Sequence, residues 1–212
     1  ILVVVCTASA VLAEWGFQAL CKQKITISDL SAAVTGLLLA LNLPASVTWW
    51  QAIIGSVIAV VVVKGLFGGI GKNFANPAIT ARIILLLAFS ASVGAAVQPV
   101  IVDATSTATP LTILKLDYGI LPSLFEMMIG LRGGAIGETC SLALILGGVY
   151  LMIRKVITWH TPVIFVGCVF LFTLILNGSL EFALYEVLSG GLLIGAIFMA
   201  TDYSTTPSRA WG

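Results

Sequence analysis

Long apolar runs alternate with short polar connections along the chain, and their lengths indicate which of them can cross a membrane. A helix needs about 20 apolar residues to span the hydrocarbon core, with about 17–25 tolerated. Residues 1–20 and 49–66 meet this length, and we also predict spanning helices over 78–97, 135–153 and 162–176. The pattern therefore predicts a bundle of transmembrane helices.

Three further apolar runs are too short for a plain span. Residues 30–43 stop at Pro44, and 121–131 and 187–200 are shorter than a bilayer requires. We predict short or broken helices there, with 121–131 re-entrant or on the outer surface. The glycine-rich stretch 65–78 predicts irregular backbone, which at membrane depth is tolerated only where protein or a cavity covers it.

Composition supports the same fold class. The chain is 59% hydrophobic and 9% charged, with a mean hydropathy of +1.13, whereas soluble domains carry about 25% charged residues. We predict an all-α polytopic membrane protein with one transmembrane domain over residues 1–212. Because the chain opens on Ile1 within an apolar run, we also expect it to be part of a longer protein, incomplete at both ends.

Lysine and arginine positions give the expected orientation, because cytoplasmic loops are enriched in both. If Lys22 and Lys24 are inside, alternating the spans places eight of the ten basic residues on or near the inside and leaves Lys115 and Arg132 outside. The connection over about 98–121 then faces the extracytoplasmic side. The other six inside residues are Lys64, Lys72, Arg82, Arg154, Lys155 and Arg209.

Two segments resemble each other. Residues 36–44 and 191–207 each run from a Gly/Leu-rich short helix into a polar turn that contains proline. In this orientation they run in opposite directions, which is the signature of inverted-topology repeats. The alternative is that two Gly/Leu-rich helices look alike by composition.

Other features exclude some functions. Since no basic tract with interleaved aromatic residues occurs, we expect no nucleic-acid partner. The four cysteines form no Cys-x-x-Cys or Cys/His pair, so we expect no metal ligands and no catalytic residues in this chain alone. Glu14 is an ionisable group within an apolar run. Such a group is functional or paired, which leaves cation movement, an interface, or pairing with a helix outside this chain.

The octet DATSTATP, residues 103–110, gathers four hydroxyl side chains between apolar flanks. It has three interpretations: a solvated loop, a helix start with Pro110 at the first position, or an acceptor site for a phosphoester, with small Ala108 beside Thr109. The last two are compatible, because a phosphate near a helix N-terminus meets free N–H groups.

The octet resembles the flavinylation motif Asp-x-x-Ser-Gly-Ala-Thr found in the D subunit of the Rnf complex and in the B subunit of the sodium-pumping NADH:quinone reductase. The resemblance extends through residues 68–78, 134–148 and 190–207 and so covers essentially the whole chain. It is closest to the D subunit of the Rnf complex. Thr107 departs from the motif, which usually has glycine at that position.

The resemblance implies a flavoprotein of the bacterial inner membrane, with a fold of ten spans in two inverted halves. FMN would be joined through its phosphate to Thr109 by a flavin transferase outside the cytoplasm. The flavin would carry electrons between ferredoxin and NAD, coupled to movement of Na⁺ or H⁺. The partners would be the flavin-bearing G subunit, the A and E subunits of the membrane, and the C and B subunits on the NADH and ferredoxin sides.

Other residues are candidates for the flavin site. Ser106 is expected to bond the flavin phosphate, while Asp103 assists the transferase, caps the loop, or is an exposed acid. Gly137, Glu138 and Thr139 line the flavin pocket, or they cap a helix with Glu138 in its first turn. A second, non-covalent flavin such as riboflavin is expected at Asn73 and Asn76, whose alternative is a structural turn.

The turn of the second similar segment is a weaker candidate of the same kind. Its polar residues are Asp202, Thr205 and Thr206.

A solute channel or transporter of the urea-transporter type is the alternative function, because it shares an inverted-repeat fold. The octet separates the two, since a channel needs no acceptor threonine. The sequence contains no NAD-binding fingerprint or cluster motif, so partner subunits must supply those functions.

Overall fold

The computed structural model describes residues 1–69, 71–94, 96–97, 106–107, 110–116 and 121–202. The contacts gather in two compact units, which are described separately. Unit 1 is Ile1–Gly94 with Asp202, and unit 2 is Ala95–Thr201, in both cases over the described residues. The expectation of a single domain over 1–212 stays a prediction.

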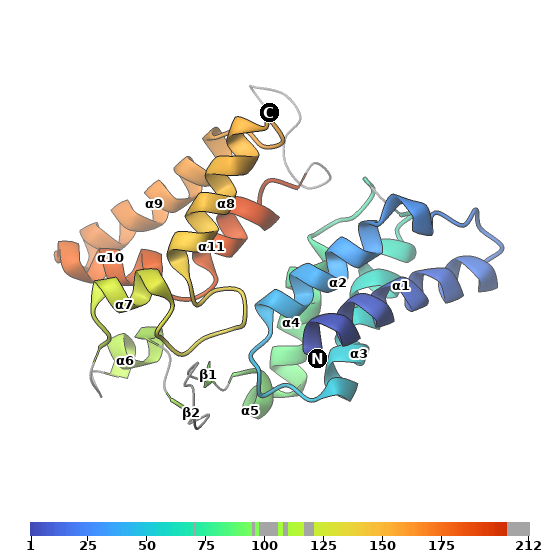
Figure 1. The fold of residues 1–212 in the computed structure, drawn as a ribbon, viewed down its shortest axis with the longest axis horizontal. Coiled ribbons are helices and arrows are strands. Elements are labelled where there is room, and N and C mark those ends of the chain that lie inside the picture. Colours follow the sequence, from blue (N-terminus) through green and yellow to red (C-terminus); the bar gives the residue numbers. More distant parts are fainter. Residues whose placement is uncertain (70, 95, 98–105, 108–109, 117–120, 203–212) are drawn as a thin grey trace. The chain divides into compact units, whose positions relative to one another are not determined.

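Unit 1 is built from helices that run back and forth through one bundle (Figure 1). Its elements in chain order are α1 (Leu2–Leu20), η1 (Ile27–Asp29), α2 (Ser31–Asn42), α3 (Trp49–Val57), the π-helical segment η2 (Ile58–Gly65), α4 (Pro77–Ala88) and α5 (Ser90–Val93).

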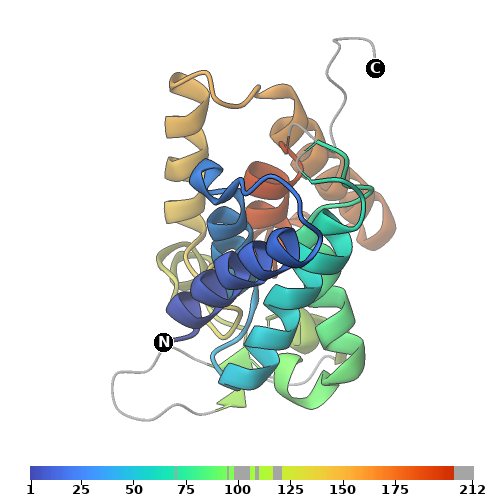
Figure 2. The ribbon, with the colours of Figure 1, turned by 90° about the vertical axis from the view of Figure 1, so that its right-hand side faces the viewer.

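A glycine sets the distance between α1 and α2, which lie side by side (Figure 2). A Cβ atom on Gly36 would lie 2.6 Å from the Cys6 carbonyl oxygen and 2.9 Å from the Ala10 Cβ atom. Cys6 and Ala10 are fully buried. Small residues allow the backbones of membrane helices to approach closely, which compensates for the missing hydrophobic drive in lipid.

Polar caps define where two helices of unit 1 begin. Thr48 and Gln51 form a capping box at the start of α3, with the Thr48 N–H donating to Gln51 Oε1 at 3.0 Å. Asn76 caps α4, with Pro77 in the first turn. Both caps satisfy N–H groups that would otherwise lack partners within the helix.

Unit 2 contains a small strand pair and six helical segments among its described residues. Strands β1 (Ala96–Val97) and β2 (Ser106–Thr107) are antiparallel, with Ala96 opposite Thr107. The helical segments are α6 (Pro110–Leu116), α7 (Leu124–Ile129), α8 (Ser141–Ile153), α9 (His160–Asn177), α10 (Leu180–Leu188) and α11 (Leu192–Ile194), which continues as the π-helical η3 (Gly195–Met199).

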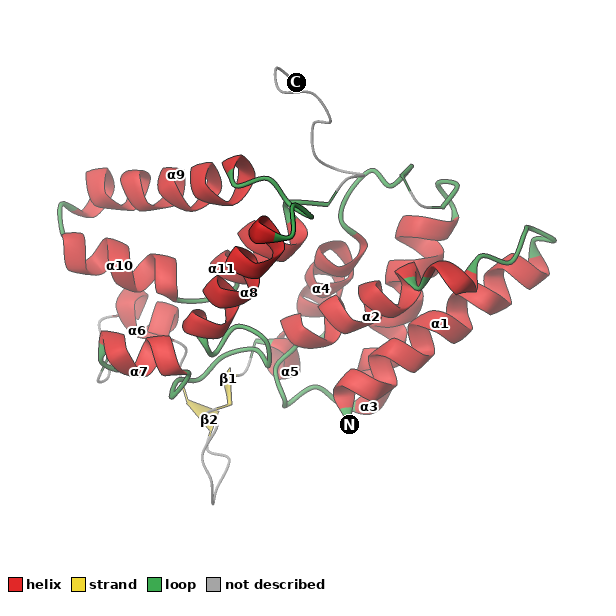
Figure 3. Cartoon of the chain, turned by 45° about the horizontal axis from the view of Figure 1, so that its top comes forward, coloured by secondary structure: helices red, strands yellow, loops and turns green. Residues whose placement is uncertain are grey.

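Helices α9 and α10 form a hairpin (Figure 3). Gly178, at φ +65°, closes α9, and the Ser179 hydroxyl accepts a hydrogen bond from the Phe182 N–H at the start of α10. No described residue covers one side of α9, where Leu176 is 81% exposed. Such a surface suits contact with lipid or with another membrane helix.

The helices confirm the predicted fold class. By length and composition α1 and α9 can each cross a membrane, and α10 with α11–η3 forms a third candidate span, bent by 65°. The short helix predicted over 30–43 appears as α2, and the helix over 49–66 appears as α3–η2.

Two helix boundaries and one whole helix differ from the prediction. Helix α4 ends at Ala88, α8 begins only at Ser141, and α10 was not predicted at all. In the last case Glu181 and Glu186 interrupt the apolar run, so length and hydropathy alone gave no signal for a helix.

Candidate functional site

The residues of the octet fall only partly within the described structure. Asp103 and Thr109 lie outside the described residues, and Ser106 belongs to strand β2. Helix α6 begins at Pro110. The predicted helix start is therefore confirmed, because proline lacks an N–H and its φ angle suits the first helical position.

Helix α6 packs on the break between α10 and α11. Gly190 has a φ of +61°, which favours glycine, and a Cβ atom there would lie 2.7 Å from Leu111 Cδ1. Leu111 is the second residue of α6. The segment that follows Thr109 in the chain is thus held against the bend at residues 189–191.

Arg132 organises the loop between α7 and α8 from a buried position. It is 2% exposed. Its Nε donates to the Thr139 carbonyl at 3.0 Å, and its Nη2 donates to the Glu138 carbonyl and, at 3.5 Å, to Ser141 Oγ. Burial lowers the pKa of Arg132 and the nearby Glu138 charge opposes this, but a guanidinium stays protonated in proteins.

Glu138 is the acidic residue of the same loop and is 5% exposed. Its Oε1 accepts the Ala135 N–H at 2.9 Å. A Cβ atom on Gly134 would lie 2.8 Å from this oxygen, so the carboxylate packs directly against the glycine. Helix α8 begins at Ser141 and has no acid in its first turn. The interpretation of Glu138 as a first-turn cap is therefore wrong.

Four buried polar atoms in unit 2 have no hydrogen-bond partner among the described residues. They are Arg132 Nη1, Glu138 Oε2, Glu186 Oε2 and Ser189 Oγ. Ser141 connects their two segments, since its Oγ donates to the Leu188 carbonyl at 3.3 Å while lying within reach of Arg132. We call Arg132, Glu138, Ser141 and Ser189 the arginine cluster. Buried polar atoms normally have hydrogen-bond partners, so the unpartnered atoms of Arg132, Glu138, Glu186 and Ser189 each need an explanation.

The two asparagines predicted to bind a second flavin differ in their hydrogen bonding within the glycine loop of unit 1. Asn76 Oδ1 accepts the Ala78 and Ile79 N–H groups at 3.1 and 3.3 Å, which confirms its role in a structural turn. Asn73 differs, because its Oδ1 is buried and has no partner among the described residues. Of the second similar segment's turn, Asp202 is described, whereas Thr205 and Thr206 lie outside the described residues.

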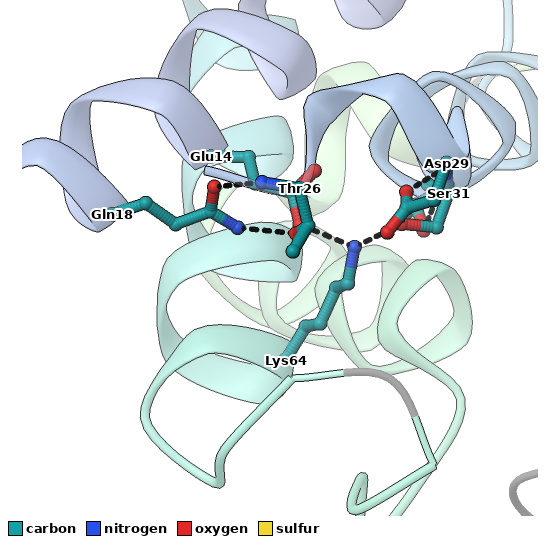
Figure 4. A network of polar contacts seen from close by, with 7 residues as sticks. Glu14, Gln18, Thr26, Asp29, Ser31 and Lys64 are labelled. Carbon is teal, nitrogen blue, oxygen red and sulfur yellow. Dashed lines mark hydrogen bonds and ion pairs between the residues drawn. The ribbon is translucent and has the colours of Figure 1, made fainter. Parts of the chain in front are cut away.

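A buried ion pair joins three helical elements of unit 1 (Figure 4). Lys64 Nζ lies 2.5 Å from Glu14 Oε1 and also donates to Ser31 Oγ at 2.5 Å. The Lys64 and Glu14 side chains are 4% and 6% exposed. The expectation that Glu14 meets an interface or a helix outside this chain is therefore wrong, because its partner is a lysine 50 residues away in the same unit.

The connection between α1 and α2 is fixed next to this pair. Gln18 Nε2 donates to Thr26 Oγ1 at 2.8 Å, and the Thr26 N–H donates to Gln18 Oε1 at 2.9 Å (Figure 4). Lys64, counted from the sequence as an inside residue, thus lies at the same end of unit 1 as the connection that contains Lys22 and Lys24.

Known proteins resemble the chain over its whole length. It is 42% identical over 214 residues to the D subunit of the Na(+)-translocating ferredoxin:NAD(+) oxidoreductase complex of Acetobacterium woodii. The aligned region covers 100% of this chain and 66% of that relative. It is 37% identical to the D subunit of the proton-translocating ferredoxin:NAD(+) oxidoreductase complex of Clostridium ljungdahlii, covering 96% of this chain and 66% of that relative.

A more distant relative carries a more general name. The D subunit of the ion-translocating oxidoreductase complex of Rhodobacter capsulatus is 30% identical over 244 residues, covering 96% of this chain and 68% of that protein. The chain thus spans just under two thirds of the length of the first two relatives. The family described as NQR2, RnfD, RnfE matches residues 1–212. The chain therefore belongs to the NQR2, RnfD, RnfE family.

Proposed function

We propose that the chain is part of the D subunit of an Rnf-type, ion-translocating ferredoxin:NAD oxidoreductase complex, and that it carries FMN linked by a phosphoester to Thr109. The observation that carries the proposal is the family match over residues 1–212, which includes the octet with its acceptor threonine. The relatives' names supply the class of reaction. The chain itself contributes the acceptor and its surroundings.

The described residues that follow the octet, and those that contact them, are compatible with a bound flavin. Helix α6 starts immediately after Thr109 and packs on Gly190, next to Ser189 of the arginine cluster. That cluster keeps buried donor and acceptor atoms that have no partner in the described part of the chain, as a polar ligand requires. In this proposal Ser106 bonds the phosphate, Asp103 serves the transferase or caps the loop, and Gly137, Glu138 and Thr139 line the pocket.

A second flavin is proposed at the glycine loop of unit 1. Asn73 supports it, because its buried Oδ1 has no partner among the described residues and accepts an N–H such as that of a riboflavin ring. Asn76 contributes there mainly by starting α4 beside it, since its Oδ1 is occupied by two backbone N–H groups.

A flavin supplies one-electron transfer when it is bound, and the chain's residues hold and shield it. The remaining chemistry belongs to partners in this proposal: the G subunit with its own flavin, the A and E subunits of the membrane, and the C and B subunits on the NADH and ferredoxin sides. A flavin transferase attaches FMN on the extracytoplasmic side of the bacterial inner membrane, to which the charge pattern assigns the connection over 98–121.

The alternative, a solute channel of the urea-transporter type, has less support. It explains the short and broken helices equally well, but it assigns no role to a cluster of hydroxyls outside the membrane. The relatives described above are named as oxidoreductase subunits, which favours the electron-transfer function.

In-gel flavin fluorescence of the denatured full-length subunit, made together with its transferase, tests the proposal. We expect fluorescence that survives denaturation and disappears in Thr109→Ala. Thr107→Ala is the matched control, because it removes a neighbouring threonine of the same octet and leaves the signal. If Thr107→Ala abolishes the signal instead, Thr107 and not Thr109 is the acceptor. A wild type without bound flavin contradicts the proposed function.

A further inference from the structure

The connection from α8 into α9 begins with two adjacent cations. Arg154 and Lys155 are both exposed, and neither has a carboxylate partner among the described residues. They are folded back onto the end of α8, because the Arg154 N–H donates to the Tyr150 carbonyl at 3.0 Å and the Lys155 N–H donates to the Met152 carbonyl at 2.9 Å. Residues 154–160 contain no acid. Two positive charges therefore lie side by side at the end of α8.

An aromatic pair follows in the same connection. The rings of Trp159 and His160 stack, with their centroids 4.1 Å apart and an angle of 27° between their planes. Both side chains are exposed, and only residues 156–158 separate them from Lys155. Four residues of chain span at most about 14 Å, so the cations and the rings belong to one small surface. Tryptophan is enriched at the boundary between hydrocarbon and water.

Helix α8 presents an apolar surface on one side along its whole length. Residues spaced three and four positions apart lie on one face of a helix. The opposite face is covered by η3: a Cβ atom on Gly147 would lie 3.1 Å from Phe198 Cζ, and one on Gly148 would lie 2.8 Å from Ile197 Cγ2. We call the exposed face the α8 stripe, and it consists of Leu142, Ile145, Leu146, Val149, Tyr150 and Ile153.

The length of the α8 stripe matches one leaflet of a bilayer. Its first and last residues are eleven positions apart, which at about 1.5 Å per residue is about 17 Å along the helix. The hydrocarbon core of a bilayer is about 30 Å thick, so each leaflet contributes about 15 Å. The stripe therefore extends about as far as the acyl chains of a phospholipid, and it ends directly at Arg154.

Charge and shape together define what this surface fits. Basic residues at the end of a membrane helix attract anionic headgroups. A small soluble anion would leave the α8 stripe uncovered, and a zwitterionic lipid brings an ammonium group that two adjacent cations repel. An anionic phospholipid fits both parts, because its phosphate meets the cations while its acyl chains lie along the stripe.

We propose that Arg154, Lys155 and the Trp159–His160 pair form a headgroup site for an anionic phospholipid whose acyl chains cover the α8 stripe. Arg154 donates to the phosphate oxygens through its planar fork, and Lys155 donates through its ammonium group. Trp159 holds the site at the boundary between hydrocarbon and water. The site does not involve the flavin, so it goes beyond the function proposed above.

Native mass spectrometry of the detergent-purified full-length subunit tests the proposal. The subunit is titrated with phosphatidylglycerol, which is anionic, or with phosphatidylethanolamine of the same acyl chains, which is zwitterionic. The wild type should prefer phosphatidylglycerol. In the Arg154→Gln/Lys155→Gln double variant we expect its affinity for phosphatidylglycerol to fall roughly 25-fold, since each cation near an anionic surface contributes about fivefold. Binding of phosphatidylethanolamine should stay unchanged.

Two further variants separate this site from positive charge in general. Trp159→Ala keeps both cations and removes the indole, so the affinity for phosphatidylglycerol should fall several-fold. Lys22→Gln/Lys24→Gln is the matched control, because it removes two exposed charges from the connection between α1 and α2. That connection contains the exposed acid Asp29 and no aromatic residue, so we expect little change there.

Three outcomes overturn the inference. Equal affinity of the wild type for the two lipids shows that the surface does not select an anionic headgroup. An equal fall in both double variants shows that positive charge in general, and not the connection from α8 into α9, holds the lipid. If Arg154→Gln/Lys155→Gln keeps the lipid preference but loses partner subunits from the purified complex, the surface docks a protein instead.

Discussion

At the residue scale, the sequence identified Glu14 and Glu138 as unusual acids but not their partners. Glu14 was recognisable because a charge stood alone in an apolar run. Its partner Lys64 looked like an ordinary lysine at the end of a span, and only the fold brings two residues 50 positions apart within 2.5 Å. Arg132 was counted merely as an outside charge, and its burial depends on a loop whose shape no local pattern encodes.

Removing one member of the Glu14–Lys64 pair should destabilise the protein strongly, whereas replacing both members should change its stability little. Removing one partner of a buried pair costs about 3–5 kcal/mol, whereas replacing both by apolar residues is often neutral or stabilising. We expect Glu14→Leu and Lys64→Met each to lower the melting temperature of the purified full-length subunit, and the double variant to recover most of the loss. Lys24→Met, at an exposed lysine, is the control. A double variant less stable than either single one contradicts this account.

Asp29 should make unit 1 sensitive to acid. It lies in the connection between α1 and α2, where partial burial raises its pKa, but hydrogen bonds from the Ser31 hydroxyl and N–H and the charge of Lys64 outweigh this and hold the pKa below its ordinary value of 3.8. A depressed pKa contributes stability that is fully present above the unfolded-state value and is lost as pH falls through the folded-state value.

The test compares melting temperature against pH for the wild type and Asp29→Asn, which keeps the Oδ1 acceptor. The wild type should be more stable at neutral pH, and the difference should close as pH falls below 3.8. A difference that is constant across this range would exclude a role for the charge.

At the element scale, the sequence predicted helices where apolar runs were long and uninterrupted. Helices α1, α2 and α9 match residues 1–20, 30–43 and 162–176 within a few residues. Helix α10 was not predicted because Glu181 and Glu186 interrupt its apolar run. The π-helical turns of η2 and η3 were also not predicted, because the change from i+4 to i+5 hydrogen bonding depends on packing and has no signal in the composition.

Gly36 should be indispensable for the contact between α1 and α2. A Cβ atom there would lie 2.6 Å from a backbone oxygen of α1, which cannot move aside without displacing the helix. We expect Gly36→Ala to destabilise unit 1 by about 1–3 kcal/mol, the usual cost of overpacking.

Gly16→Ala is the matched control for this substitution. Gly16 is also a helical glycine of unit 1, but nothing lies within 4 Å of a Cβ atom added there. Alanine is favoured over glycine within a helix by about 0.5–1 kcal/mol, so this variant should be neutral or slightly more stable in the same thermal melts. Equal losses at both positions would contradict the close helix contact.

At the scale of the whole molecule, the sequence led to the family and the helical fold class, and the comparisons confirm both. The predicted inverted relation between 36–44 and 191–207 and the orientation in the membrane stay predictions, since each concerns an arrangement beyond a single unit. Within the units, the structure adds two buried polar centres that the sequence did not assemble: the Lys64 network in unit 1 and the arginine cluster in unit 2.

The central claim is that the Thr109 oxygen carries the phosphate of FMN, and mass spectrometry of the subunit purified from its native membrane tests it most directly. The account predicts an intact mass raised by one FMN less one water, with the added mass located on the fragment that contains Thr109 and absent from Thr109→Ala. An unmodified polypeptide from the native host, or the flavin on another residue, would contradict it.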